Sequence, residues 1–308
     1  MTGAGSGIGR ALACELGRRG FLVTATDIDG SSAEATAALI GPFSRHASLD
    51  VRDAEAVAAC VRHIVEESGH LDMLVNNAGI PISGEVQDLT LAHWDRIIDI
   101  NLRGVVHGVA AAYPAMQRRG SGTIVNVSSI AGLSLGPLGT PYAATKHAVV
   151  GLSLSLRAEA VAYGVNVSVL CPGAVETPIL DRDNPSDLPS VPWRPDNRSY
   201  LTRLCGAPMP VDVFARQALD AVERGEGVVV RPFLARVAWW TQRFMPVLAR
   251  MRVRMVLAEQ RAAAANGTSG PPPTALRATR SDPPRESRLI PPPEGTNDLT
   301  GVGRQAVG

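Results

Sequence analysis

Short apolar runs alternate with longer amphipathic stretches from Gly7 to Val230. Six short runs predict strands at Phe21 to Thr26, Ser44 to Leu49, Leu71 to Val75, Gly122 to Val127, Val165 to Leu170 and Gly227 to Val230. Between them, apolar residues recur every three or four positions and predict helices at Ile8 to Arg19, Ser32 to Ile40, Ala54 to Ser68, Leu91 to Arg118, Pro141 to Tyr163 and Val211 to Arg224. This alternation is typical of an α/β fold in which one doubly wound parallel sheet carries helices on both faces.

The segment from Pro178 to Pro210 breaks this pattern, because it is rich in proline and shows no clear period. A long irregular segment inside a compact domain usually serves as a lid over a ligand or is disordered. We expect a substrate lid at 178–210, with Trp193, Tyr200 and Leu201 covering the ligand.

The character of the chain changes after residue 231. Residues 233–260 form a basic apolar stretch with five arginines between Arg236 and Arg254, which predicts a helical extension at 232–261 that is broken near Pro246. Such a stretch can make peripheral contact with a membrane surface, although packing on its own domain or on a sister subunit is commoner. Residues 262–308 hold two Pro-Pro-Pro runs and few apolar residues, so a disordered tail is expected after a first domain at 1–231.

Charge and cysteine content restrict the function. The 308 residues carry a formal net charge of +1 with both signs intermingled, which gives no reason to expect a nucleic-acid partner. The four cysteines are widely spaced and the six histidines lack metal-ligand spacing, so we predict no metal site and no disulfide framework. With no signal peptide and no apolar run of spanning length, a cytoplasmic protein is expected.

The first predicted helix starts in a glycine-rich loop, Thr2 to Gly9, which contains four glycines. Glycines there let backbone N–H groups approach a pyrophosphate at the positive end of the helix. The next strand ends at Asp27, eighteen residues after Gly9, where a carboxylate can bind the hydroxyls of an adenosine ribose. Because no Arg or Lys occupies positions 4–6 or 28–29 to attract a 2′-phosphate, NAD is favoured over NADP. The alternative is that Asp27 merely caps the loop.

A single lysine, Lys146, occurs in the whole chain, four residues after Tyr142. Residues four apart on a helix share a face, so the ammonium and the phenol are expected to lie together. An ammonium beside a phenol lowers the pKa of the phenol and makes it a better acid/base near neutral pH.

Together, Thr-Gly-x-x-x-Gly-x-Gly, Asn76-Asn77-Ala78-Gly79 and Tyr-x-x-x-Lys resemble the motifs of the short-chain dehydrogenase/reductase family, over residues 2 to about 230. The resemblance implies a Rossmann fold and an NAD(P)-dependent oxidoreductase. It also implies a catalytic tetrad of Asn101, Ser129, Tyr142 and Lys146. Tyr142 would be the acid/base, Ser129 would bind the substrate oxygen, and Lys146 would hold the nicotinamide ribose. Asn101 would alter the helix hydrogen bonding and hold a water that relays protons to Lys146.

The same resemblance extends the expected cofactor contacts. Ser128 is the less favoured choice for the catalytic serine, and His147 is expected to be structural. Asp50 would bind the adenine amino group, and Pro172 to Thr177 would hold the nicotinamide amide. The full expected set of cofactor contacts is Gly3, Ser6, Gly7, Ile8, Gly9, Asp27, Asp50, Val51, Asn77, Ala78, Gly79, Tyr142, Lys146, Pro172, Gly173, Val175 and Thr177.

The chain departs from the family pattern before Thr2, where a central first strand is expected and only Met1 stands. We hypothesise that the start is misplaced and that an upstream strand exists. The intact mass of the native protein would decide this.

The predicted function is hydride transfer between NAD(H) and a secondary alcohol or ketone with an apolar body. The alternatives are an NADP-linked carbonyl or 3-oxoacyl reductase, and a cofactor-binding sensor or scaffold without turnover. Family members often form dimers or tetramers. Small residues on the two long predicted helices permit such contact, or equally close packing on the sheet: Gly104, Gly108, Ala111 and Gly151.

Overall fold

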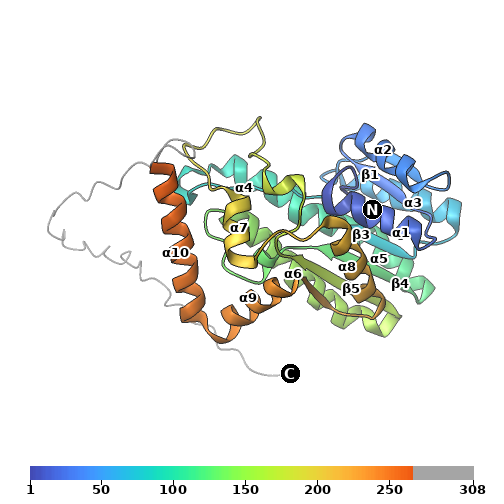
Figure 1. The fold of residues 1–308 in the computed structure, drawn as a ribbon. Coiled ribbons are helices and arrows are strands. Elements are labelled where there is room, and N and C mark those ends of the chain that lie inside the picture. The colour runs from blue at the N-terminus through green and yellow to red at the C-terminus, as the bar shows by residue number, and fades with distance from the viewer. Residues whose placement is uncertain (266–308) are drawn as a thin grey trace, which may run out of the picture. The chain divides into compact units, whose positions relative to one another are not determined.

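This computed structural model describes residues 1–265 of the chain (Figure 1). Of the tail expected at 262–308, residues 262–265 belong to a helix and 266–308 lie outside the described residues. The helix continues past the expected boundary because residues 262–265 are four alanines, the strongest helix formers.

All six expected strands are present, and every pairing between them is parallel. Two of the strands pair with each other, and the other four follow in chain order. The first pair is β1 (Thr24–Asp27) with β2 (Arg45–Ser48), and the second group is β3 (Met73–Asn76), β4 (Gly122–Val127), β5 (Val165–Pro172) and β6 (Val228–Arg231).

Met1 and Thr2 link the two parts of the sheet. The Thr26 N–H donates to the Met1 carbonyl oxygen at 2.9 Å, and the Thr2 N–H donates to the Val75 carbonyl oxygen at 3.0 Å. A cavity of about 460 Å³ is lined by residues of both β1 and β3, together with Met1.

Helices cover both faces of the sheet, which confirms the doubly wound α/β fold (Figure 1). One face carries α1 (Gly7–Arg18) packed on α8 (Val211–Glu223), with α2 (Gly30–Ile40) beside α1. The other face carries α3 (Ala54–Ser68), α5 (Gly104–Arg119) and α6 (Thr140–Ala160). Strands β3, β4 and β5 are buried on both sides, so neighbouring residues in them serve different cores. Leu74 packs with the α3–α5–α6 layer, whereas Val75 packs with the α1–α8 layer.

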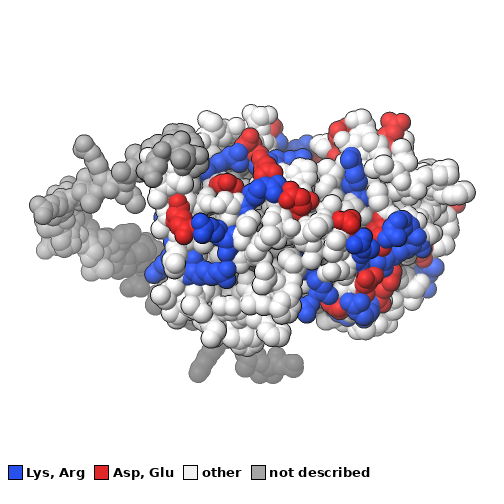
Figure 2. All heavy atoms as spheres, viewed as in Figure 1, with Lys and Arg blue, Asp and Glu red and all other residues white. Residues whose placement is uncertain are grey.

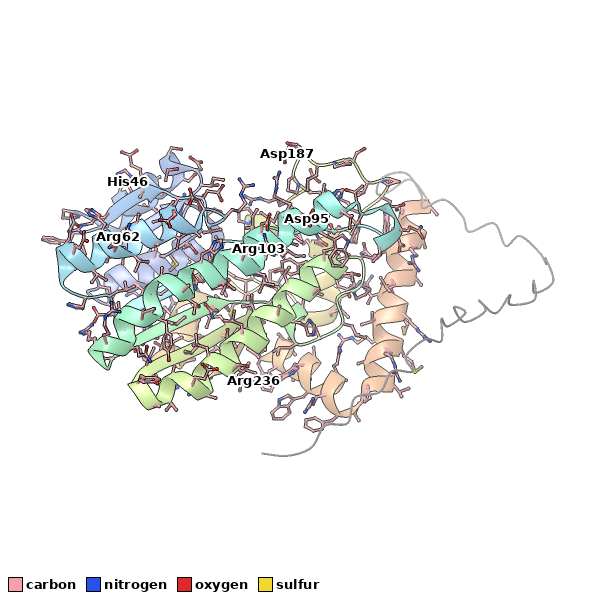
Figure 3. All side chains as sticks on the ribbon, turned by 180° about the vertical axis from the view of Figure 1, so that it is seen from behind. His46, Arg62, Asp95, Arg103, Asp187 and Arg236 are labelled. Carbon is pink, nitrogen blue, oxygen red and sulfur yellow. The ribbon has the colours of Figure 1, made fainter. Side chains whose placement is uncertain are left out.

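The helix expected at Leu91 to Arg118 is interrupted in a way that the periodicity did not indicate. It consists of α4 (Leu91–Ile98), a π-helical segment at Asp99–Arg103, and α5. The Gly104 N–H donates to the carbonyl oxygen of Asp99, five residues earlier. Figure 3 shows Asp95 and Arg103 along this continuous helical path. Such π-turns insert one residue into a helix and are frequent at functional sites.

Two of the small residues on the long helices serve the packing of this chain itself. A Cβ added to Gly108 would lie 2.1 Å from Oδ1 of Asn76, and one added to Gly104 would lie 2.8 Å from the Val51 side chain. Gly151 on α6 differs, because a Cβ there would meet nothing within 4 Å. Gly104 and Gly108 therefore bring helix backbone close to the sheet and its loops.

The segment at 178–210 contains a helix, which corrects the expectation of an irregular lid. After a short 3-10 turn at Pro178–Leu180, α7 runs from Asn197 to Cys205. Asp196 caps α7, because its side chain accepts a hydrogen bond from the Ser199 N–H at 2.9 Å. This N-cap and the apolar spacing of Tyr200, Leu201 and Leu204 are the local sequence signals that indicate a helix here.

The C-terminal extension forms two helices, α9 (Phe233–Phe244) and α10 (Pro246–Ala265). The break at Pro246 agrees with the sequence prediction, since proline is tolerated in the first helical turn but not in a helix interior. α10 holds the lid: Oε1 of the buried Gln260 accepts from the Asp196 N–H at 3.0 Å. No helix within residues 1–265 is long and apolar enough to cross a membrane.

Candidate active site

The glycine-rich loop turns directly into α1. Gly3 and Gly7 have φ of +62° and +52°, a region that residues with a Cβ rarely adopt. A Cβ on Gly9 would lie 2.0 Å from the Gly3 carbonyl oxygen. Ser6 precedes α1 with extended backbone and makes no side-chain capping bond, so its side chain leaves the first-turn N–H groups open to an anion.

Asp27 ends β1, where it caps the glycine-rich loop and also lines the cavity. Its Oδ2 accepts a hydrogen bond from the Gly5 N–H at 2.8 Å, so it does cap the loop. It also lines the cavity beside the loop, together with Ile28. The nearby Arg10 is turned away, because its guanidinium donates to the Gly5 carbonyl oxygen and to Thr36 Oγ1. Arg10 therefore leaves the carboxylate of Asp27 without a cationic partner on the cavity side.

The Asn76–Gly79 segment braces the loop from β3. Thr2 Oγ1 accepts hydrogen bonds from the N–H groups of Asn77 and Ala78 at 3.1 and 3.2 Å. The Asn77 side chain donates to the Gly3 carbonyl oxygen at 2.8 Å. Asn76 lies beneath the site, where its Nδ2 donates to Oδ1 of Asn126 at 2.9 Å in the buried sheet. Asn77, Ala78 and Gly79 thus face the cavity, whereas Asn76 holds β3 to β4.

Asp50 and Val51 lie at the adenosine end of the same cavity, after β2. Asp50 forms an ion pair with Arg52 at 2.6 Å, and this guanidinium lowers the pKa of Asp50. The Val51 carbonyl oxygen is 2.9 Å from Nδ1 of His107 on α5. Both residues are therefore held in place by neighbouring side chains.

Tyr142 and Lys146 lie one turn apart on α6, as their spacing predicts. The Lys146 Nζ is 5.5 Å from the centre of the Tyr142 ring. It donates a hydrogen bond to the Val127 carbonyl oxygen at 3.0 Å. Lys146 is buried, and this burial lowers its pKa to about 8.

The pKa of Tyr142 differs from the sequence expectation, which had it lowered by Lys146. Burial raises the pKa of Tyr142 above its ordinary value, and a hydrogen bond with Ser129 acts in the opposite direction. Removal from water disfavours the phenolate, and the Lys146 amine is directed at Val127 rather than at the phenol oxygen.

The two adjacent serines after β4 have different tasks. Ser129 lines the cavity and hydrogen-bonds to Tyr142, and its Oγ also accepts from the Ala131 N–H at 3.2 Å. Ser128 is buried and donates to the Lys146 carbonyl oxygen at 2.8 Å, which fixes α6 on β4. Both serines line the cavity, but the hydroxyl of Ser128 is already engaged with α6, and the choice of Ser129 for the substrate contact stays a prediction.

Asn101 is the one expected site residue that does not line the cavity. It is fully buried in the π-segment, and its Oδ1 accepts from the Ile80 N–H at 2.9 Å while its Nδ2 donates to the Ile80 carbonyl oxygen at 3.0 Å. A Cβ on Gly79 would lie 3.2 Å from Oδ1 of Asn101 and 3.5 Å from Nζ of Lys146. Asn101 thus fixes the Gly79–Ile80 backbone beside Lys146, and its side-chain amide is occupied by protein groups.

The Pro172–Thr177 segment closes the other end of the cavity. The Gly173 N–H donates to the Arg231 carbonyl oxygen at 2.8 Å, and a Cβ on Gly173 would lie 2.6 Å from Cβ of Ala235. The first turn of α9 therefore packs directly on this segment. Arg198 of α7 forms ion pairs with Glu176 at 2.7 Å and Asp181 at 2.6 Å, joining the lid to the same segment.

One cavity of about 340 Å³ connects these groups from the glycine loop to the lid. It is lined by every expected site residue other than Asn101: Gly3, Ser6, Gly7, Ile8, Gly9, Asp27, Asp50, Val51, Asn77, Ala78, Gly79, Ser129, Tyr142, Lys146, Pro172, Gly173, Val175 and Thr177. The glycine cradle at one end and the Ser–Tyr–Lys group beyond it fit an extended dinucleotide with a reacting ring beside Tyr142.

Comparison with known proteins decides the family. Residues 1–187, more than half of the chain, match the protein family named short chain dehydrogenase. This chain belongs to the short chain dehydrogenase family. The dehydrogenase is therefore an oxidoreductase that interconverts an alcohol and a carbonyl group with NAD(P)(H).

Two curated relatives and one solved structure illustrate the likeness. The dehydrogenase is 41% identical over 187 residues to a putative ketoacyl reductase of the monensin polyketide synthase from Streptomyces virginiae, covering 59% of this chain and 72% of the relative. It is 33% identical to the D-beta-hydroxybutyrate dehydrogenase of Rhizobium meliloti (strain 1021), covering 60% and 74%. A 3-ketoacyl-(acyl-carrier-protein) reductase from Brucella melitensis, solved with NADH, superposes with a TM-score of 0.66 at 28% identity, covering 74% of this chain and 93% of that one.

The substrate end of the dehydrogenase cavity includes residues that the motifs did not indicate. Apolar groups come from the loop after β3 and from the lid, among them Ile80, Ile82 and Leu180. Of the three residues expected to cover a ligand, Tyr200 and Leu201 line the cavity, but Trp193 does not. Trp193 is buried instead with Leu138 and with Ala264 of α10, because a large aromatic side chain packs best between lid and extension.

Among the residues of the 178–210 segment that line the cavity, Tyr200 has a notable hydroxyl group. Its hydroxyl is buried and has no hydrogen-bond partner within residues 1–265. Burial raises its pKa, so it stays a neutral donor. A buried hydroxyl without a partner costs folding free energy, and its position in the cavity wall suits an oxygen of a bound molecule.

The buried Lys146 makes stability depend on pH. Since its pKa is lowered to about 8, the unfolded chain binds more protons than the folded chain between about pH 8 and the ordinary lysine value of 10.5. Below pH 8 the buried charge of Lys146 therefore lowers the free energy of unfolding by its full amount, and this destabilisation disappears as pH rises toward 10.5. In Lys146→Met this charge is absent. The free energy of unfolding of the variant minus that of the native chain should therefore fall by roughly 3 kcal/mol between pH 7 and about pH 10.5. Chemical denaturation at both pH values measures this, and a constant difference would contradict it.

Proposed function

We propose that the protein is an NAD-dependent dehydrogenase of secondary alcohols, or the corresponding ketone reductase, with Tyr142 as the acid/base. The observation that carries the proposal is the placement of Ser129, Tyr142 and Lys146 on one wall of the cavity that starts at the glycine loop. Bound NAD supplies the acceptor for the substrate hydride and, when oxidised, a positive charge near Tyr142.

The proposed roles follow from the contacts. Ser129 donates a hydrogen bond to the substrate oxygen and holds it beside the phenol, with which it is already hydrogen-bonded. Tyr142 accepts the hydroxyl proton in oxidation and returns it in reduction. Because burial raises the pKa of Tyr142 in the free protein, the positive charges of Lys146 and of the oxidised cofactor are needed to stabilise the phenolate.

Asn101 is proposed to act through the backbone. Its amide clamps both polar groups of Ile80, which fixes Gly79 against Lys146. The adjacent π-turn changes the hydrogen bonding of nearby carbonyl groups, and such a carbonyl suits the water that relays protons to Lys146.

A change at Tyr142 tests the acid/base assignment. We expect Tyr142→Phe to lower kcat roughly a thousandfold, because the proton then lacks an acceptor, while the Kd for NAD stays nearly unchanged. The matched control is Tyr163→Phe, which removes the hydroxyl of the half-exposed tyrosine that follows α6 and should leave kcat unchanged. Steady-state assay of NADH absorbance and cofactor titration provide the two readouts. Undiminished turnover in Tyr142→Phe would refute the role.

The preference for NAD over NADP is proposed from the charges near the end of β1. The carboxylate of Asp27 faces the cavity, Ile28 beside it is largely exposed, and Arg10 is engaged elsewhere. A 2′-phosphate would meet a like charge there with no cation to offset it.

The double change Asp27→Ser with Ile28→Arg tests this preference. Removing the anion and adding a guanidinium should shift the ratio of kcat/KM for NAD over NADP by roughly a hundredfold toward NADP, equivalent to about 3 kcal/mol. Asp29→Ala is the matched control, since Asp29 caps α2 but does not line the cavity. It should cost about 1 kcal/mol of stability and leave the ratio unchanged. An unchanged ratio in the double variant would remove the basis for the NAD assignment.

The lining of the substrate end supports an apolar alcohol or ketone. Ile80, Ile82, Leu180 and Leu201 provide the apolar wall, and the Tyr200 hydroxyl offers one hydrogen bond apart from the Ser129–Tyr142 pair. We propose a substrate that carries a second oxygen besides the reacting one. This also accommodates the alternative of a 3-oxoacyl reductase, whose substrates have an ester or thioester oxygen near the ketone.

Tyr200→Phe distinguishes a second oxygen from a purely apolar substrate. We expect KM for a 3-oxo ester to rise about tenfold while KM for a simple aliphatic ketone stays the same, since only the ester loses a hydrogen bond. The variant should also be more stable than the native chain by about 1 kcal/mol without substrate, because it removes a buried donor that lacks a partner. Equal effects on both ketones would contradict the proposal.

A homodimer or homotetramer is proposed through the outward faces of α5 and α6. Val106 on α5 and Leu154 on α6 are exposed apolar residues, and Gly151 beside Leu154 leaves room for a close helix contact. The inward faces of the same helices are already occupied by the sheet.

A further inference from the structure

The outward face of α9 is apolar along its whole length. Phe233, Val237, Trp240 and Phe244 follow one another at intervals of four, three and four residues, which places them in one stripe. All four are exposed, Trp240 to 57% and Phe244 to 77%. The opposite side of the helix faces the fold, through the buried Ala235 and through Gln242, whose Oε1 accepts from the Leu135 N–H. The stripe therefore points away from the body of the protein.

α10 has the same two-sided construction. Ala249, Val256 and Gln260 are buried against the fold. Met251 and Met255, four residues apart on the other side, are exposed, as is Val247 one turn earlier. A solvent-facing helix side normally carries polar residues, so apolar stripes on both helices indicate a partner.

The charge from α9 through most of α10 is of one sign, and Glu259 near the end of α10 is paired with Arg203 at 3.5 Å. No Asp or Glu occurs from Gly227 to Ala258, whereas six arginines do. Arg236 and Arg243 flank the apolar stripe of α9, and Arg250 and Arg254 flank that of α10. None of these four forms an ion pair within residues 1–265, although most other arginines there do. Figure 2 shows the mostly uncharged surface over α9, and Arg236 is labelled on that helix in Figure 3.

We propose that the outward faces of α9 and α10 dock on the surface of a bilayer that contains anionic phospholipids. The apolar stripes would enter the headgroup region, with Trp240 at the level where indole rings are favoured, and the flanking arginines would contact the phosphates. The packing of α9 on Gly173 and of α10 on Asp196 ties this face rigidly to the catalytic domain.

A second copy of this chain fits the same face less well. A two-fold interface brings identical surfaces together, so the unpaired arginines of the two copies would oppose each other with no carboxylate from Gly227 to Ala258 to offset them. An anionic lipid surface supplies the missing negative charge.

Co-sedimentation of the full chain with vesicles tests the proposal. We expect binding to vesicles of equal parts phosphatidylcholine and phosphatidylglycerol, and weaker binding to phosphatidylcholine alone or at high salt. The double variant Trp240→Glu/Phe244→Glu should abolish binding. Arg236→Gln/Arg243→Gln should weaken it roughly 25-fold, because each arginine near such a surface contributes about fivefold.

Matched control variants distinguish vesicle binding by this face from non-specific binding by other exposed residues. Phe43→Glu replaces another exposed aromatic residue, 82% exposed and far from α9 in sequence, and should leave vesicle binding unchanged. Arg62→Gln/Arg118→Gln removes two exposed arginines that also lack ion pairs within residues 1–265, and should likewise have no effect. Retained NAD binding in each variant shows that it is folded.

Three results would overturn the proposal. The first is absence of binding to the anionic vesicles, and the second is unchanged binding of the Trp240→Glu/Phe244→Glu variant. The third result has two parts. Sedimentation velocity without lipid shows that the native chain is a dimer and the Trp240→Glu/Phe244→Glu variant a monomer, and the native chain does not bind the vesicles. That result would assign the face to a second copy of the chain.

Discussion

Between the glycine-rich loop and the end of β3, backbone segments approach so closely that one added carbon would collide. A Cβ on Gly3 would lie 2.7 Å from Cα of Ala78, and a Cβ on Gly9 would lie 2.0 Å from the carbonyl oxygen of Gly3. This contact fixes the start of α1 relative to β3 and places Asn77, Ala78 and Gly79 in the cavity wall. The remainder of the site is built outward from it, because Gly79 in turn lies against Asn101 and Lys146.

The cavity wall near Tyr142 and Lys146 holds groups whose burial costs folding free energy. Lys146 is buried with one hydrogen bond to a carbonyl oxygen, and its neighbour Tyr142 is half-buried with a raised pKa. In the free protein, removal from water disfavours the charged form of each group. A bound cofactor and substrate would add polar partners for both groups.

Much of this could be read from the sequence, for identifiable reasons. Most of the strands were predictable because they are short apolar runs buried on both sides, whereas β2 is polar and half exposed. The cavity residues were predictable because the motifs place them at strand ends that share one edge of the sheet. What failed was set by tertiary context. Trp193 turns toward α10 rather than toward the cavity, and the π-turn at Asn101 leaves the apolar spacing of its helix almost unchanged. α7 is the exception, because its Asp196 cap is a local signal that the sequence does contain. The pKa of Tyr142 was mispredicted because sequence spacing gives the distance to Lys146 but not the direction of its amine or the degree of burial.

The isolation of Lys146 has a practical consequence for chemical labelling. The chain contains one side-chain amine in its whole sequence, and that amine lines the cavity with a pKa lowered to about 8. A reagent that acylates amines or condenses with them therefore has one side-chain target, and part of that target is unprotonated and nucleophilic in mildly alkaline buffer. The extent of modification at this one position would report directly on whether the cavity is filled, without any assay of turnover.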